Sequence, residues 1–180
     1  RDLGLFRAAD GNIYLASAPA PELLALRDKL TVNVKRTNIG KKAKTYSLPA
    51  TNSGACEILM DIDARKSKQI DLVLANNAGE KVVMAYDVAW HALSFDRRES
   101  GIVDFSQDFP AVTVSPTFED NGKISLRIFI DKSSIEVFGN NGQFVMTNLV
   151  FPKNPYTALS ISSTDGNAKI ENLKIYSINE

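Results

Sequence analysis

The sequence has very few of the side chains on which hydrolytic, redox and zinc sites depend. Its 180 residues include one Cys, one His and one Trp. A single Cys excludes an internal disulfide framework, and one His with one Cys cannot complete a zinc site of the usual kind. A nucleophilic triad would have to use His91, and no Gly-x-Ser-x-Gly turn accompanies it. We therefore expect no metal and no cofactor, and we interpret Cys56 as a small buried hydrophobe.

An excess of charge of either sign is also absent. Lys and Arg together number 21, and Asp and Glu number 21, so the formal net charge is zero. A nucleic-acid surface normally needs a basic excess, and a polybasic membrane patch needs clustered Lys and Arg. No window approaches the ~18 consecutive apolar residues of a spanning helix. The sequence therefore predicts neither a nucleic-acid partner nor a membrane partner.

Long helical patterns are missing, and residues 1–30 read differently from the rest. Pro21 can open a helix, because its absent N–H is not needed at the first helical position. Glu22 in the first turn suits the positive end of the helix dipole. These signals predict one short helix over residues 21–28. We interpret residues 1–30 as a connector and residues 31–180 as one domain.

From Thr31 onward, apolar and polar residues alternate in one short run after another. A period of two indicates half-buried strands in an antiparallel sheet. Turns that contain Gly separate the runs, and two of these turns are Asn-Gly pairs, a strong hairpin signal because both residues tolerate positive φ. About ten strands without a long helix favour an all-β antiparallel β-sandwich, with a closed barrel as the alternative. The alternating apolar residues are Ile58, Met60, Ile62, Leu72, Leu74, Val82, Met84, Tyr86, Val88, Ile124, Leu126, Ile128 and Ile130, and the expected turns are at residues 77–79, 121–122, 141–142 and 165–166.

Two pairs of carboxylates are candidates for chemistry. Asp61 and Asp63 begin like a calcium loop, but the loop's required Gly and Glu positions hold other residues, so a strand explains them better. Asp131 and Glu136 could approach each other across a tight turn, as a glycosidase pair must. The turn itself, however, uses Asp and Ser for backbone hydrogen bonds, and Ile135 takes the inner face beside Glu136. We interpret both pairs as structural.

Aromatic side chains are the candidates for stacking on a sugar. Within alternating strands most aromatic rings are core or cross-strand partners. Trp90 is the weak favourite for an exposed, carbohydrate-binding ring. The other rings considered are Tyr14, Tyr46, Tyr86 and Tyr156.

The block from Ile130 to Phe138 carries a more specific pattern. It reads Ile-Asp-Lys-Ser-Ser-Ile-Glu-Val-Phe. This block resembles the Asp-Arg/Lys-Ser-Ser-Val/Ile-Glu-Val/Ile-Phe signature in the C-terminal sandwich of glycoside hydrolase family 32, the family of invertases, inulinases and levanases. The runs at residues 94–101 and 142–152 are similar to the same module, and the opening through Pro21 looks like the connector that leaves the family's catalytic propeller. The signature residues, for which we expect a structural role, are Asp131, Ser133, Ser134, Glu136 and Phe138.

The resemblance implies a lectin-like (concanavalin-type) β-sandwich without the family's catalytic carboxylates. Those carboxylates lie in Trp-x-Asn-Asp-Pro-Asn, Arg-Asp-Pro and Glu-Cys motifs. Neither Arg-Asp pair of this chain is followed by Pro, and Cys56 precedes Glu57, so the Glu-Cys order is reversed. We therefore expect no catalytic residue in this chain.

The function implied is that of a non-catalytic C-terminal domain of a β-fructosidase that acts on fructans or sucrose. The parent would be a retaining glycoside hydrolase with two catalytic carboxylates on its propeller, and this module would pack on that propeller and stabilise it. One alternative is a lectin-like module that binds fructan or sucrose itself, and another is an interaction module unrelated to sugars. The family likeness suggests a periplasmic or extracellular location. A separated docking face would be apolar, so we also expect a homo-oligomer in concentrated solution.

Overall fold

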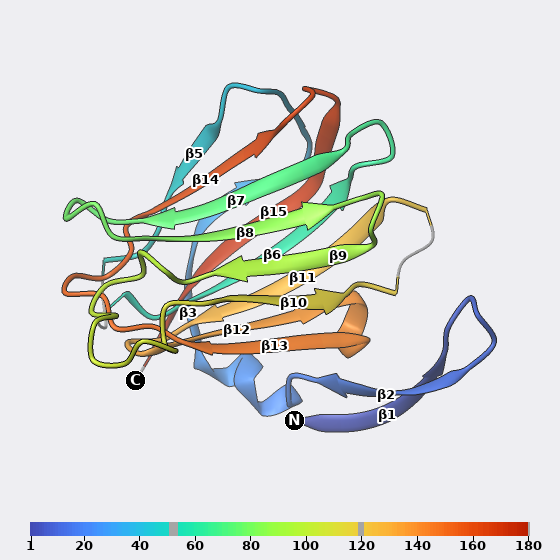
Figure 1. The fold of residues 1–180 in the computed structure, drawn as a ribbon, viewed down its shortest axis with the longest axis horizontal. Coiled ribbons are helices and arrows are strands. Elements are labelled where there is room, and N and C mark those ends of the chain that lie inside the picture. Colours follow the sequence, from blue (N-terminus) through green and yellow to red (C-terminus); the bar gives the residue numbers. More distant parts are fainter. Residues whose placement is uncertain (51–53, 119–120, 180) are drawn as a thin grey trace.

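A computed structural model describes residues 1–50, 54–118 and 121–179 as two antiparallel sheets packed face to face, with a separate hairpin at the N-terminus (Figure 1). In spatial order, the seven-stranded sheet contains β13 (Phe144–Leu149), β12 (Ser134–Gly139), β11 (Lys123–Ile130), β6 (Cys56–Asp63), β15 (Ala168–Ile178) and β3 (Arg27–Val34), with β4 (Thr37–Ile39) also paired to β15. The six-stranded sheet contains β10 (Val112–Pro116), β9 (Ala92–Asp96), β8 (Lys81–Asp87), β7 (Gln69–Ala75), β14 (Ala158–Ser163) and β5 (Lys44–Ser47). The hairpin is β1 (Asp2–Arg7) with β2 (Ile13–Ala18), and the 3-10 helices whose bounds lie within the described residues include η1 (Pro21–Leu26) and η3 (Asn140–Gly142).

The core lies between the two sheets and consists of the residues whose alternation the sequence displays. On β6, the side chains of Ile58, Met60 and Ile62 are at most 2% exposed. The same parity buries every second residue on β7, β8 and β11, because successive strand side chains point to opposite faces. The predicted core is therefore confirmed, except that Val88 packs against it from a partly buried position. The two separate sheets confirm the sandwich over the closed barrel.

Two of the four expected Gly turns close hairpins and two do not. The turns at residues 77–79 and 141–142 join paired neighbours, β7 with β8 and β12 with β13. Gly122 and Gly166 have the expected positive φ of 67° and 88°, but they lie where the chain passes from one sheet to the other. The hairpin interpretation is wrong for the Asn-Gly turn at residues 121–122, since β11 pairs with β6 and β12. The turn at residues 165–166 is present as expected, and β15, which follows it, pairs with β3, β4 and β6.

The predicted helix over residues 21–28 is shorter and tighter than expected. It is the 3-10 helix η1, which begins at Pro21 and has no buried residue. Arg27 has extended backbone dihedrals and begins β3, which pairs with β15. The helix ends early because strand pairing takes Arg27 and the residues after it. The strand β3 therefore crosses the expected division at residue 30.

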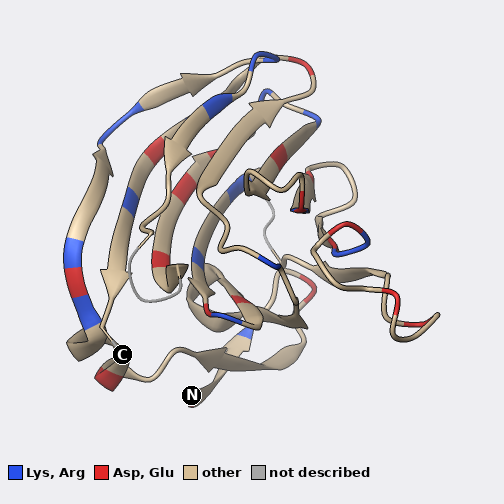
Figure 2. Cartoon of the chain, turned by 90° about the vertical axis from the view of Figure 1, so that its left-hand side faces the viewer, with Lys and Arg blue, Asp and Glu red and all other residues tan. Residues whose placement is uncertain are grey.

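Acidic and basic residues are interspersed along the strands and loops (Figure 2). This distribution agrees with the balanced composition of 21 basic and 21 acidic residues. None of the helices among residues 1–50, 54–118 and 121–179 has the length and apolar character needed to cross a membrane.

Candidate functional site

The signature block forms the turn between β11 and β12 and continues along β12. The N–H of Asp131 donates to the carbonyl of Ser134 at 2.9 Å, and the N–H of Val150 donates to the carbonyl of Ser133 at 3.0 Å. The side chain of Asp131 accepts the N–H of Lys132 at 2.7 Å. The Asp and Ser positions of the block therefore fix a tight turn and tie it to the end of β13.

Glu136 lies on the outer face of the seven-stranded sheet, between the buried Ile135 and Val137. Its carboxylate pairs with the guanidinium of Arg1 and accepts the hydroxyl of Thr147 at 3.1 Å. The same guanidinium donates to the Thr147 hydroxyl at 2.7 Å. Glu136 thus contacts the N-terminal segment, and none of its hydrogen bonds among the described residues goes to Asp131.

Phe138, on the same strand, also contacts Arg1. Its side chain is 2% exposed, and the Arg1 guanidinium lies over its ring at 5.3 Å from the centroid. The ring of Phe129 meets it edge-on at 6.0 Å. Phe138 and Glu136 therefore hold the first residue of the chain against the sheet, with a cation–π contact beside an ion pair.

A buried ionic triad of Arg27, Glu57 and Arg127 holds the next part of the N-terminal segment. Glu57 is 0% exposed, and its Oε2 accepts Nε of Arg27 at 2.5 Å, while Oε1 accepts Nη2 of Arg27 at 2.9 Å. Nε of Arg127 donates to the same Oε1. The Arg27 guanidinium also lies 4.4 Å from the centroid of the Tyr176 ring, and the hydrogen bonds that it donates to Glu57 raise the pKa of Arg27. The triad connects β3, β6 and β11 on one face of the sheet.

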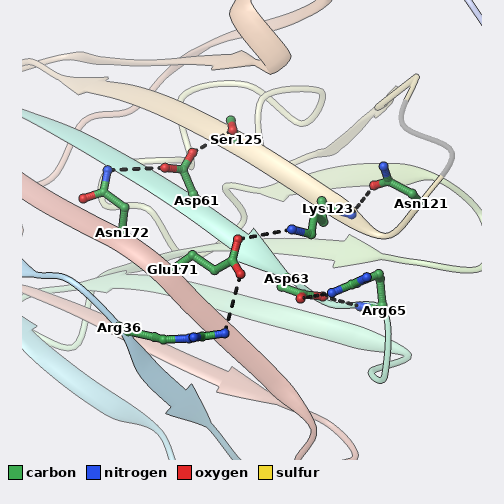
Figure 3. A network of polar contacts seen from close by, with 9 residues as sticks. All are labelled: Arg36, Asp61, Asp63, Arg65, Asn121, Lys123, Ser125, Glu171 and Asn172. Atoms are coloured by element: carbon green, nitrogen blue, oxygen red, sulfur yellow. Dashed lines mark hydrogen bonds and ion pairs between the residues drawn. The ribbon is translucent and has the colours of Figure 1, made fainter.

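A band of polar residues continues along this face beyond the triad (Figure 3). Asp61 accepts the Ser125 hydroxyl at 2.7 Å and the side-chain amide of Asn172 at 3.3 Å. Glu171 pairs with Lys123 at 3.4 Å, and it also pairs with Arg36. These contacts join neighbouring strands across the sheet.

Asp63 ends the polar band at the far end of β6. It forms an ion pair with Arg65 at 2.7 Å. The hydrogen bonds from Arg65 lower the pKa of Asp63 to about 2. Asp61 and Asp63 lie in a strand, as the alternation predicts. Groups of three or more His, Cys, Asp or Glu that could hold a metal do not occur in the part of the chain that the structure describes.

The N-terminal hairpin presents an exposed apolar face. One face of the hairpin turns toward the sandwich, where Phe6 and Tyr14 contact the ring of Phe118 at 5.4 and 4.8 Å between centroids. The strand register places the odd-numbered residues of both strands together on the opposite face. That outer face carries Leu3 (71% exposed), Leu5 (74%), Ile13 (58%) and Leu15 (61%). In Figure 1 the hairpin extends away from the two packed sheets.

The remaining sequence candidates are distributed over the molecule rather than gathered in one site. Trp90 is 81% exposed in the turn between β8 and β9, and the exposed His91 follows it with a φ of 47°. Cys56 is buried, as predicted, and desolvation raises the pKa of its thiol to about 12. Tyr86 is buried in the core, and the hydroxyl of the buried Tyr156 donates to the carbonyl of Ser100 at 2.6 Å. Tyr14 and Tyr46 are half-buried.

Sequence reasoning missed the ionic triad and the role of Arg1. Glu57 lies between the buried Cys56 and Ile58, so its parity alone assigns it to the outer face. Arg127 has the same parity on β11, but it lies diagonally across from Glu57, and only the strand register brings them together. That register cannot be obtained from the sequence of either strand.

Comparisons with known proteins match the chain to one family. Residues 22–177 match the family model described as "Glycosyl hydrolases family 32 C terminal". The chain is 28% identical over 181 residues to a levanase from Bacillus sp. (strain L7), and the matched region covers 99% of the chain and 19% of the levanase. It is 31% identical over 156 residues to an extracellular exo-inulinase from Aspergillus awamori, covering 82% of the chain and 29% of that protein. The chain thus spans less than a third of the length of these relatives.

Solved structures have the same fold. The crystal structure of the exo-inulinase from Aspergillus awamori matches with a TM-score of 0.82 and 24% identity, over 99% of this chain and 35% of that one. A β-fructofuranosidase from Schwanniomyces occidentalis, complexed with fructosyl-erythritol, matches with a TM-score of 0.75 and 16% identity, over 100% of this chain and 40% of that one. At these sequence identities the likeness shows a shared fold alone.

Proposed function

Since the chain belongs to the C-terminal module of glycosyl hydrolase family 32, we propose that it is the non-catalytic C-terminal domain of a β-fructosidase that cleaves fructans or sucrose. In this proposal a separate catalytic propeller carries the two carboxylates of a retaining hydrolysis. Residues 1–30 form the connector and residues 31–180 the sandwich module, with β3 running across the division. The names of the relatives include an extracellular exo-inulinase, which supports a site of action outside the cytoplasm, in the periplasm or the medium.

The outer face of the N-terminal hairpin is the surface that docks on the catalytic domain. Four large aliphatic side chains there are each more than half exposed. Contiguous exposed apolar surface of this kind is typical of an interaction site. The relatives have more than two thirds of their length outside the matched region, so a partner domain within the same polypeptide is available to them. This exposed face is the single observation that carries the docking proposal.

Two contacts support a defined position of that docking surface. Arg1 binds Glu136 and Thr147 on β12 and β13, and Arg27 binds Glu57 on β6. Both contacts fasten the N-terminal segment to the outer face of the seven-stranded sheet. A docked catalytic domain would therefore take a fixed orientation on the sandwich rather than hang from a free linker.

The docking proposal is tested by exchanging single residues on the hairpin. Leu15→Lys places a charge on this face at a residue that is 61% exposed. Val114→Lys is the matched control, at a residue of β10 that is 65% exposed. In a full-length parent enzyme we expect L15K to lower the melting temperature and V114K to leave it unchanged. In the 180-residue chain alone we expect weak self-association in sedimentation, which L15K reduces. Equal effects of the two substitutions would contradict the docking surface.

The non-catalytic role is tested separately with the purified 180-residue chain. We expect no release of fructose from sucrose, inulin or levan, because the chain lacks the family's three carboxylate motifs. Hydrolysis that co-purifies with the chain and is lost on substitution of Asp131 or Glu136 would overturn this role. A natural gene without a catalytic domain would overturn the whole proposal.

A further inference from the structure

A polar hollow of about 300 Å³ lies on the outer face of the seven-stranded sheet, beside the connector. The hollow is separate from the docking surface, because the exposed leucines of the hairpin are not among the residues that line the hollow. Its polar residues come from β6, β11, β15 and η3, and its apolar residues come from the end of β2, the connector residue after it, β6, β11 and β12. The uncharged and acidic polar residues of the lining are Asp61, Ser125, Asn141 and Asn172.

The polar groups of the hollow have unused hydrogen-bonding capacity. Each carboxylate oxygen of Asp61 accepts one bond, from Ser125 or Asn172, and can accept another. The side-chain carbonyl of Asn172 accepts no hydrogen bond among the described residues, and one of its amide protons is unused. The side chain of Asn141 has no partner within that same part of the chain, and it stands at a residue with a φ of 58°. Acceptors and donors therefore converge on one small space.

The charges around the hollow determine which ligands it can accept. Asp61 repels an anion, and Arg127, which also lines the space, repels a cation although Glu57 neutralises it in part. A neutral ligand that offers both hydroxyl donors and hydroxyl acceptors meets neither repulsion. Leu59, Pro19 and Phe138 provide apolar surface for the C–H face of such a ligand. A concave space with a few convergent polar groups on an apolar lining is the usual form of a small-molecule site.

We propose that this hollow binds one or two units of a neutral saccharide. Asp61 and Asn172 accept hydroxyl protons, Asn141 donates to a hydroxyl oxygen, and the sugar ring lies against Leu59 and Pro19. The site is on the seven-stranded sheet, whereas the exposed Trp90 is in a turn of the six-stranded sheet. Saccharide binding through the hollow therefore leaves Trp90 uninvolved.

The proposal is tested by titrating the ¹⁵N-labelled 180-residue chain with sucrose and with short inulin-type and levan-type oligosaccharides. We expect saturable shifts of the side-chain amide signals of Asn141 and Asn172, with a dissociation constant of about 1–10 mM, and no change in Trp90 fluorescence. Sodium sulfate is the anionic probe and should cause no saturable shift at these signals. Absence of shifts with all sugars, shifts centred on Trp90, or saturation by sulfate would each overturn the proposal.

Two variants locate the binding within the hollow. Asn141→Gly removes only the amide, because glycine adopts a φ of 58° without strain. Asp61→Asn keeps the shape and removes the charged acceptor, and we expect each variant to weaken binding by about 5–10-fold. Asp63→Asn makes the same chemical change two residues along β6, at an aspartate that pairs with Arg65 outside the hollow, and should bind as the wild type does. Equal affinity of all three variants would refute the site, whereas equal effects of L15K and V114K on melting temperature would refute only the docking surface and leave the site standing.

Discussion

Replacement of Glu57 by Gln tests how the N-terminal segment is held on the seven-stranded sheet. Gln has nearly the shape of Glu, so E57Q keeps the packing and removes the negative charge. In the wild-type chain that charge faces the guanidinium groups of Arg27 and Arg127. The variant leaves two cations facing an uncharged amide in a part of the sheet from which water is largely excluded.

The size of the effect follows from the burial of the three groups. The side chain of Glu57 is 0% exposed, and those of Arg27 and Arg127 are 23% and 21% exposed. Loss of one member of a buried ion pair destabilises a protein by about 3–5 kcal/mol, compared with about 0.2–1 kcal/mol for an exposed pair. Because both arginines keep some contact with water, we expect about 3 kcal/mol, at the lower end of the buried range. With a urea m-value of about 2 kcal/mol/M, the midpoint falls by about 1.5 M.

The assay is equilibrium unfolding in urea, followed by far-ultraviolet circular dichroism. Glu99→Gln is the matched control, because Glu99 is 64% exposed and pairs with Lys81 at 2.9 Å. We expect this control to lose less than about 0.5 kcal/mol. A loss of less than about 1 kcal/mol in E57Q, with an unchanged m-value, would refute the view that the buried triad fastens the connector.

Three further predictions concern separate parts of the molecule. The buried thiol of Cys56, whose pKa is raised to about 12, should not react with a disulfide reagent at neutral pH until urea unfolds the chain, and reaction at the rate of a free thiol would contradict its burial. Arg65 lowers the pKa of Asp63 from 3.8 to about 2, so the charged form contributes stability above about pH 4 that is lost as the pH falls toward 2. The difference in unfolding free energy between wild type and D63N should be constant from neutral pH to about pH 4 and shrink below it, and a pH-independent difference would count against the ion pair. Gly101→Ala should destabilise the folded chain by about 2–3 kcal/mol, because φ is 135° and a Cβ would lie 2.5 Å from Cα of Pro152. The control Gly40→Ala should be nearly neutral, because a Cβ there meets no atom within 4 Å. Equal urea midpoints for the two variants would contradict this prediction.

Much of the core could be predicted from the sequence, because the alternation of apolar and polar residues within a strand shows which of them face the core. Ile58, Met60 and Ile62 are buried whichever strands lie beside β6. The pairing partners of each strand could not be predicted in the same way, since they depend on strands that are far apart in the chain. The turn at Gly122 has the expected local conformation, yet it joins the two sheets instead of a hairpin.

The candidate site was predictable only in part for the same reason. The signature block was recognisable as a pattern of consecutive residues, and parity placed Glu136 on the outer face. The partner of Glu136 is Arg1, which is 135 residues away, and no local signal connects the two. Helix signals at Pro21 and Glu22 were correct for the start of η1, but the pairing of Arg27 with β15 ended it.

The continuity of β3 with the connector has a consequence for recombining homologous genes. A crossover between residues 27 and 34 would build β3 from two parents, so its pairing with β15 would join residues that had not been selected together. A crossover just before Arg27 would combine the arginine of one parent with the connector of another and change the angle at which the hairpin leaves the sheet. A crossover ahead of the hairpin moves Arg1, Arg27 and their partners as one inherited block. Module exchange should therefore succeed with the hairpin included and fail when the cut falls at the expected boundary near residue 30.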